Sequence, residues 1–200
     1  MKGFLYSKLG KTNDEKVSMK LNIIQKILIF TIIGTITSTL TGLVFFGFEI
    51  FQLKSTFFQF IIVGLICSLS FILFKLKRYR DSVFILIIIF LFEYMWVGSK
   101  YPITHFIYFL SVIICAFIYS KYFYIQSQQV KLSRPLILSS LMALIFVIDY
   151  YILLLIYEAG PGKLLPFKNM PIGFLTGLGV GIGIEVSEYL IFRIESNRRQ

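Results

Sequence analysis

Charged side chains are scarce in this sequence, and hydrophobic ones are abundant. Only 15% of its 200 residues are Asp, Glu, Lys or Arg, and 57% are hydrophobic. A soluble domain typically has about 25% charged and roughly 45–50% apolar residues. So few charges cannot cover a surface that faces water, and the apolar, aromatic composition also excludes a disordered chain. The class that remains is an integral membrane protein.

Histidine and cysteine are nearly absent as well. His105 is the single histidine, which excludes bis-histidine haem ligation and His-rich zinc sites within this chain. Cys67 and Cys115 both lie in apolar runs, so we interpret them as buried, inert thiols rather than a disulfide framework. The sequence has no Gly-rich nucleotide loop and no Ser/His or Cys/His arrangement suited to nucleophilic catalysis. We therefore assign no catalytic residue, no metal and no cofactor.

Six apolar runs are long enough to cross the hydrocarbon core, which takes roughly 20 residues of helix. They are 27–49, 56–74, 82–99, 103–120, 136–157 and 171–192. None shows the in–out alternation of an outer-membrane strand, and in lipid a continuous run must satisfy its backbone groups as a helix. Pro102, Pro135 and Pro171 fall at or just before predicted helix starts, where a missing N–H costs little. The predicted fold is all-α: one polytopic membrane domain over 1–200, a bundle of six transmembrane helices.

The basic residues predict the orientation of this bundle. The formal net charge is +10, and sixteen of the twenty bases lie in the tail 1–26, the loops 75–81 and 121–134, and the C-terminus. Alternating spans place these segments on one side, and bases accumulate on the cytoplasmic side. We expect both termini in the cytoplasm, residence in a bacterial cytoplasmic membrane, an uncleaved first span, and no nucleic-acid partner.

Two predicted spans carry small residues at every fourth position. They are Gly34, Ser38 and Gly42 in the first span and Gly173, Gly177 and Gly181 in the sixth. Such stripes allow close helix approach in lipid, so we expect the first span to pack on another helix, with the sixth the obvious candidate. Gly179 and Gly183 point away from the second stripe. Packing within the chain, a pore-lining or moving helix, and an oligomer interface all remain open.

Four acidic residues lie within the predicted spans, and they are the candidate site. They are Glu93, Asp149, Glu185 and Glu188. A carboxylate at the membrane centre costs at least about 2.5 kcal/mol, so such residues usually face the bundle or a wet cavity. No Lys or Arg lies inside a predicted span. The acids are therefore protonated, hydrogen-bonded to Tyr, Ser or Thr, or bound to a cation. We expect Asp149 and Glu93 at levels that differ from the level of Glu185 by roughly 5–10 Å along the membrane normal.

We interpret the chain as a transporter, or the membrane subunit of one, whose cavity binds a cation, a proton or a substrate at these acids. The expected partners are the lipid bilayer and either a second copy or another membrane subunit. One alternative is a non-transporting accessory subunit, and another is an oligomeric channel lined by the glycine-rich sixth span. An intramembrane enzyme using Glu185 and Glu188 as acid and base is disfavoured, because a basic phosphate-binding constellation at membrane depth is missing.

In length and number of predicted spans, the chain resembles the substrate-binding membrane components of energy-coupling-factor vitamin transporters. The resemblance implies a helical bundle that works with partner subunits. It extends to no motif: the Ala-based helix contact of that family has no counterpart here, where the alanines are Ala116, Ala143 and Ala159. No residue roles are transferred from it.

Overall fold

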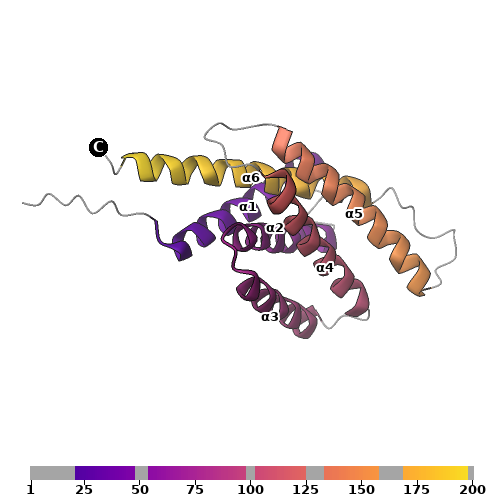
Figure 1. Ribbon diagram of the computed structural model, residues 1–200. Helices are drawn as coiled ribbons and strands as arrows, with labels where there is room; N and C mark the ends of the chain where they lie inside the picture. Colours follow the sequence, from indigo (N-terminus) through magenta and orange to yellow (C-terminus); the bar gives the residue numbers. More distant parts are fainter. Residues whose placement is uncertain (1–20, 48–53, 98–101, 125–132, 158–168, 198–200) are drawn as a thin grey trace, which may run out of the picture.

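The computed structural model describes residues 21–47, 54–97, 102–124, 133–157 and 169–197, and nearly all of these residues are helical (Figure 1). The elements in chain order are α1 (Ile23–Phe46), α2 (Lys54–Lys75), α3 (Tyr79–Val97), α4 (Pro102–Ile118), the π-helical turn η2 (Tyr119–Phe123), α5 (Ser133–Tyr157) and α6 (Asn169–Asn197). No strand occurs among the described residues, which confirms the all-α prediction. The greater part of the basic tail, residues 1–20, lies outside them.

Each of the six predicted runs coincides with one helix, with ends that differ by a few residues. The largest difference is in α6, which extends to Asn197, five residues past the predicted end. Within the described residues, four helical segments are both long and apolar enough to cross a membrane: Ile23–Phe46, Phe106–Phe123, Ser133–Ile152 and Met170–Asn197. The apolar part of α2, Gln59–Lys75, is shorter. Six crossings remain a prediction.

Many hydroxyl groups inside the apolar helices donate to carbonyl groups of their own helix. In α1, the hydroxyl groups of Thr35, Thr37, Thr39 and Thr41 each donate to the carbonyl four residues earlier, at 2.7 to 2.8 Å. Ser and Thr adopt this bond where water is not at hand. The Ser38 hydroxyl instead donates across to the carbonyl of Phe60 in α2, at 3.0 Å. These bonds let hydroxyl-bearing residues lie in an apolar helix at little cost.

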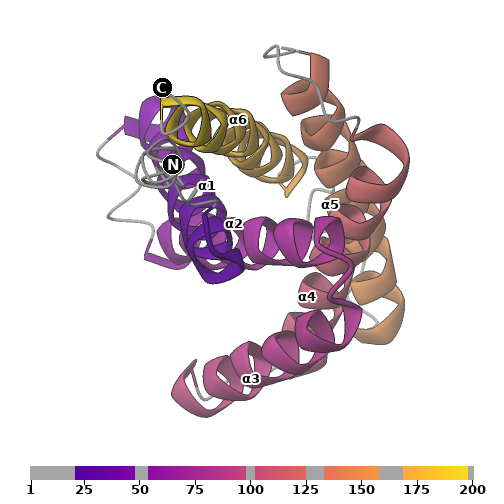
Figure 2. The ribbon, with the colours of Figure 1, turned by 60° about the vertical axis from the view of Figure 1, so that its left-hand side comes forward.

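Helix α6 lies between α5 and α1 and packs along both (Figure 2). Helix α1 also packs along α2, and α2 packs on α4. Helix α3 contacts only α2 and α4 among the described elements and lies at the edge of the bundle (Figure 2). The centre of the molecule is therefore the α1–α6–α5 layer.

Two glycine faces of α6 make this layer possible. On one face, a Cβ at Gly177 would lie 2.8 Å from the Cα of Ser139, and one at Gly181 would lie 2.6 Å from the Cα of Pro135, both in α5. On the other face, a Cβ at Gly179 would lie 2.5 Å from the Cα of Ser38 in α1. Real Cβ atoms do not approach backbone so closely, so even alanine would force the helices apart.

The small-residue stripe of α1 does pack against α6, as expected, but it does not meet the Gly173–Gly177–Gly181 stripe of α6. The α6 residues that contact the α1 stripe are Gly179 and Gly183. A Cβ at Gly183 would lie 2.6 Å from the Cα of Gly34. The 173–177–181 stripe packs against α5 instead. An α6 with helices on two sides needs two small faces, and the five glycines of this helix supply both.

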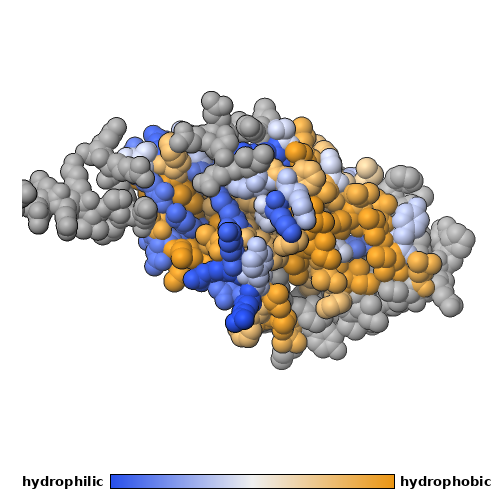
Figure 3. Space-filling model, viewed as in Figure 1, coloured by the Kyte–Doolittle hydropathy of each residue, from blue (hydrophilic) through white to orange (hydrophobic). Residues whose placement is uncertain are grey.

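Large apolar side chains cover the outside of the bundle, and small or polar ones fill much of its inside. Leu28, Ile32, Ile36 and Leu40 recur every fourth residue of α1 and are each about half exposed. Ser38, Ser68 and Ser139 are fully buried. Figure 3 shows hydrophilic side chains gathered toward the end where the C-terminus lies, and apolar ones over the rest of this face. Contiguous exposed apolar surface of this kind marks contact with lipid or protein.

Candidate functional site

Three carboxylates of α6 are paired with bases from three other helices. Arg134 Nη1 in α5 donates to Glu185 Oε1 at 3.1 Å, and Lys75 at the end of α2 contacts Glu188. Lys26 in α1 lies 3.0 Å from Glu195. At about 100° per residue the three acids lie within roughly 80° of one another around α6. This ion-pair ladder joins four helices at one end of the bundle.

The innermost pair of the ladder corrects the expectation that the acids inside the spans lack basic partners. Arg134 and Glu185 are each only 4% exposed. Helix α5 begins at Ser133, three residues before the predicted span, so Arg134 lies in its first turn. Gly181 packs against Pro135, and Glu185 follows Gly181 by one helical turn. The close glycine contact thus places the guanidinium against the carboxylate.

Tyr124 covers the ladder from the π-helical end of α4. The Arg134 guanidinium carbon lies 5.1 Å from the centre of the Tyr124 ring, and the Lys75 ammonium lies 4.8 Å from it. Lys75 also donates to the Tyr124 hydroxyl at 3.3 Å. Burial, together with the positive charges of Lys26 and Arg134, lowers the pKa of Lys75 to about 8. These cation–π contacts let two cations share one small volume with their acids.

Asp149 is held quite differently, between α5 and α4. Its side chain is only 1% exposed. The Ser111 hydroxyl donates to Asp149 Oδ1 at 2.6 Å, whereas Oδ2 has no hydrogen-bond partner among the described residues. Tyr108, one turn before Ser111 on α4, packs against Phe146 of α5 with ring centres 5.6 Å apart. An ionised carboxylate without a counter-charge is costly in such surroundings, so a proton or a cation must accompany it.

Asp149 and Glu185 belong to two separate places rather than one. Asp149 lies fifteen residues after Arg134 on α5, which is about 22 Å along a helix axis. Because Arg134 contacts Glu185, the two acids are separated by far more than the 5–10 Å expected from the sequence. The ladder occupies one end of the bundle, and Asp149 lies toward the other.

Several residues named in the sequence analysis fall outside the described residues. The side chains of Glu93, near the end of α3, and of His105, in α4, are two of them. The sequence analysis in turn missed Arg134, Tyr124 and Ser111. Arg134 directly precedes Pro135, a residue recognised as a helix start, and this adjacency is the signal that could have placed a cation at the start of the span.

Among the described residues, no group of three His, Cys, Asp or Glu side chains is placed to hold a metal ion. Comparisons with known proteins add no assignment, because no protein-family model, curated protein or solved structure matches this chain. Any functional conclusion therefore depends on the chemistry of Asp149 and of the ion-pair ladder.

Proposed function

We propose that this chain is a small multi-pass membrane protein that transports an ion or a substrate, or is the membrane subunit of such a transporter. Asp149 is its proton- or cation-binding carboxylate. The observation that carries the proposal is the Oδ2 atom of Asp149, which is buried and has no hydrogen-bond partner among the described residues. A membrane-depth acid with free acceptor capacity is typical of a proton or ion path. Glu185 and Glu188 are engaged by bases, so they serve to hold the bundle together.

The ion-pair ladder supports the proposed orientation. It brings together the start of α1, the end of α2, the start of α5 and the end of α6. Helices that alternate in direction across a bilayer have these ends on the same side. Three of the four base-rich segments contribute a cation there, at Lys26, Lys75 and Arg134, and the fourth, the C-terminus, directly follows α6. Base-rich ends indicate the cytoplasmic face, so we place both termini in the cytoplasm.

The packing of α6 favours neither alternative function. Its two glycine faces are already filled by α5 and α1 of the same chain. A channel lined by this helix, or an accessory subunit that docks a partner on its glycines, needs one of these faces free. The remaining face presents Ile182, Val186 and Tyr189, which are partly exposed and suited to lipid.

Proton flux in proteoliposomes tests the role of Asp149. The purified chain is reconstituted with an internal pH-sensitive dye, and a potassium–valinomycin potential drives protons inward. We expect wild-type vesicles to acidify faster than empty ones and Asp149→Asn vesicles to match the empty ones, because the amide cannot exchange a proton. Glu195→Gln, at the most exposed pair of the ladder, is the control and should retain flux.

Two results would contradict this proposal. One is equal flux through wild type and Asp149→Asn, which removes the carboxyl group from the path. The other is wild-type flux no faster than in empty vesicles. Glu93→Gln, measured in parallel, shows whether the acid of α3 belongs to the same path.

A further inference from the structure

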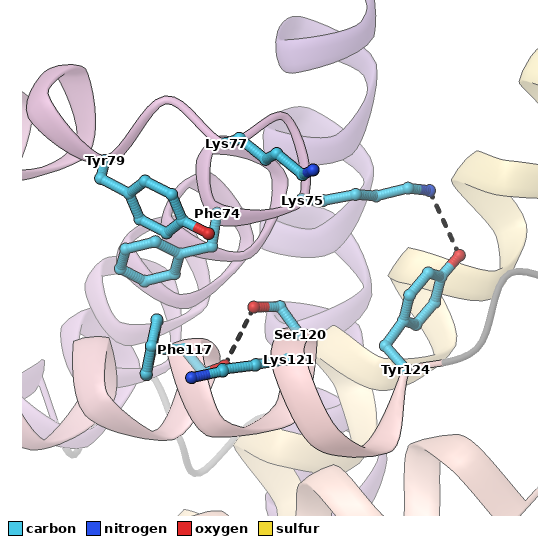
Figure 4. A pocket seen from close by; sticks show the side chains of 8 residues that line it. All are labelled: Phe74, Lys75, Lys77, Tyr79, Phe117, Ser120, Lys121 and Tyr124. Atoms are coloured by element: carbon cyan, nitrogen blue, oxygen red, sulfur yellow. Dashed lines mark hydrogen bonds between the residues drawn. The ribbon is translucent and has the colours of Figure 1, made fainter.

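A second candidate site lies at the end of the bundle that bears the ladder, where α2 turns into α3 and α4 ends in η2. It is a cavity of about 310 Å³, which is in the lower range of small-molecule pockets. Figure 4 shows its lining, with the α2–α3 turn on one side and the α4–η2 segment on the other. The lining residues are Phe74, Lys75, Lys77, Tyr79, Phe117, Ser120, Lys121 and Tyr124.

The charge of this cavity is of one sign. Three of its eight lining residues are lysines and none is acidic. Lys75 is neutralised by Glu188. Lys77 and Lys121 are exposed and have no ion-pair partner among the described residues. They come from opposite walls of the cavity (Figure 4), so their two uncompensated ammonium groups favour an anion between them.

The backbone at Lys77 gives independent support. Its φ is 58°, in the left-handed region that favours glycine and costs other residues roughly 1–2 kcal/mol. Lys77 follows the end of α2, and the N–H of Arg78 donates to the carbonyl of Leu73 at 2.9 Å. Helices commonly end this way with glycine at the left-handed position. A lysine there keeps a cation at the cavity wall at the expense of backbone strain.

Apolar surface continues directly from the cavity. Phe74, Tyr79 and Phe117 form its aromatic side, with Phe74 and Phe117 ring centres 5.4 Å apart. One turn further along α3 and α4, Phe84 is 66% exposed and Ile114 is 44% exposed. Lysines and tyrosines above exposed apolar helix faces are the usual side chains at a membrane interface. A phosphate bound here would therefore lie at headgroup level, with acyl chains along α3 and α4.

We infer that this cavity binds a phosphate-bearing anionic group through Lys77 and Lys121. An anionic lipid headgroup and free phosphate share that chemistry, and the aromatic side and the adjoining apolar surface favour the lipid. The inference goes beyond the proposed transport function, with which it shares the membrane location alone. Loss of lipid binding and loss of proton flux are separate measurements, so each proposal can fail without the other.

The test is lipid retention by the full-length chain in detergent, measured by native mass spectrometry with phosphatidylglycerol and with zwitterionic phosphatidylcholine. We expect wild type to prefer phosphatidylglycerol. In Lys77→Gln/Lys121→Gln this preference should fall about twentyfold, because each base near the surface contributes roughly a fivefold factor. Arg80→Gln/Arg193→Gln removes the same charge from exposed positions outside the cavity, and it should keep the preference.

Inorganic phosphate, titrated at constant ionic strength, distinguishes the two sources. Displacement of lipid by phosphate identifies the phosphate group itself as the ligand, and retention of lipid identifies the whole headgroup. Equal loss in the two double variants, or no preference in wild type, overturns the inference. Lys77→Gly is the control for misfolding. It should melt at or above the wild-type temperature, because glycine suits φ 58°, and it should still lose about fivefold in its preference for phosphatidylglycerol.

Discussion

At the residue scale, buried acids of this chain are stabilised in two different ways. Glu185 is neutralised by Arg134 at 3.1 Å within a network of further ion pairs and an aromatic ring. Asp149 has a single described donor, the Ser111 hydroxyl, and its second oxygen has none among the described residues. The first arrangement has its charges and hydrogen bonds matched, which suits a structural role. The second can still take up a proton or a cation, which suits a transport role.

The ion-pair ladder predicts that removing a buried acid lowers the stability of the protein much more than removing a partly exposed one. Glu185→Gln removes the carboxylate that Arg134 contacts while the cation stays buried, and it should cost about 3–5 kcal/mol of unfolding free energy. Glu195→Gln breaks a pair whose side chains are 28% and 25% exposed, so it should cost less than about 1 kcal/mol. Denaturant unfolding in detergent micelles, followed by circular dichroism, measures both.

A double variant separates the charge effect from a loss of packing. Replacing both partners, as Arg134→Met with Glu185→Met, should be far milder than Glu185→Gln, because it leaves no buried charge behind. Similar losses in Glu185→Gln and Glu195→Gln would show that the buried pair does not hold the bundle together.

At the element scale, α6 is the helix around which the described bundle is built. Its glycines contact α5 on one face and α1 on the other, and its acids contact α5, α2 and α1. The four-residue spacing of glycines in the sequence revealed one of these faces. The helix that packs on each face was not predictable. Glycine spacing shows which face of a helix lacks side chains, but it does not identify the neighbouring helix that packs there.

Single methyl groups on these faces should destabilise the bundle. Gly177→Ala brings a Cβ to 2.8 Å from the Cα of Ser139, and Gly179→Ala brings one to 2.5 Å from the Cα of Ser38. We expect each to cost about 1–3 kcal/mol, the usual cost of overpacking. Thermal unfolding in detergent provides the measurement.

The matched control is Val186→Ala on the partly exposed face of the same helix, which should change the melting temperature little. Gly177→Leu is the stronger version of the same test, and Gly42→Leu probes the stripe of α1. If the glycine variants melt like Val186→Ala, close packing through α6 is not what stabilises the layer.

At the scale of the whole molecule, the distribution of bases and the distribution of apolar surface point to one orientation in a bilayer. The bases of the ladder and of the lysine-lined cavity lie at one end, and half-exposed apolar side chains cover α1, α3, α5 and α6. The positions of the bases between the apolar runs predicted that these bases gather at one end, and the orientation of that end in a bilayer stays a prediction. The lysine-lined cavity was not predictable, because it forms between two segments, 74–79 and 117–124, that are distant in the chain.

Cysteine accessibility in intact cells tests this orientation. On a Cys67→Ser/Cys115→Ser background, Lys121→Cys should be protected from a membrane-impermeant maleimide added outside. Lys54→Cys, in the loop predicted on the opposite side, should react. Both should react after the membrane is permeabilised, which controls for buried positions. The reverse pattern would invert the proposed topology, and reaction of both in intact cells would contradict it.

The amino-acid sequence by itself determined that the described chain is helical, because long apolar runs must satisfy their own backbone groups. It also determined which helices can be approached closely, because glycine spacing follows the helical period. Only the tertiary structure decided that Glu185 meets Arg134 while Asp149 lies about 22 Å away along α5, and that Lys77 and Lys121 line one cavity. These relations depend on which helices are neighbours and at what register, and both are set by packing between segments distant in the chain.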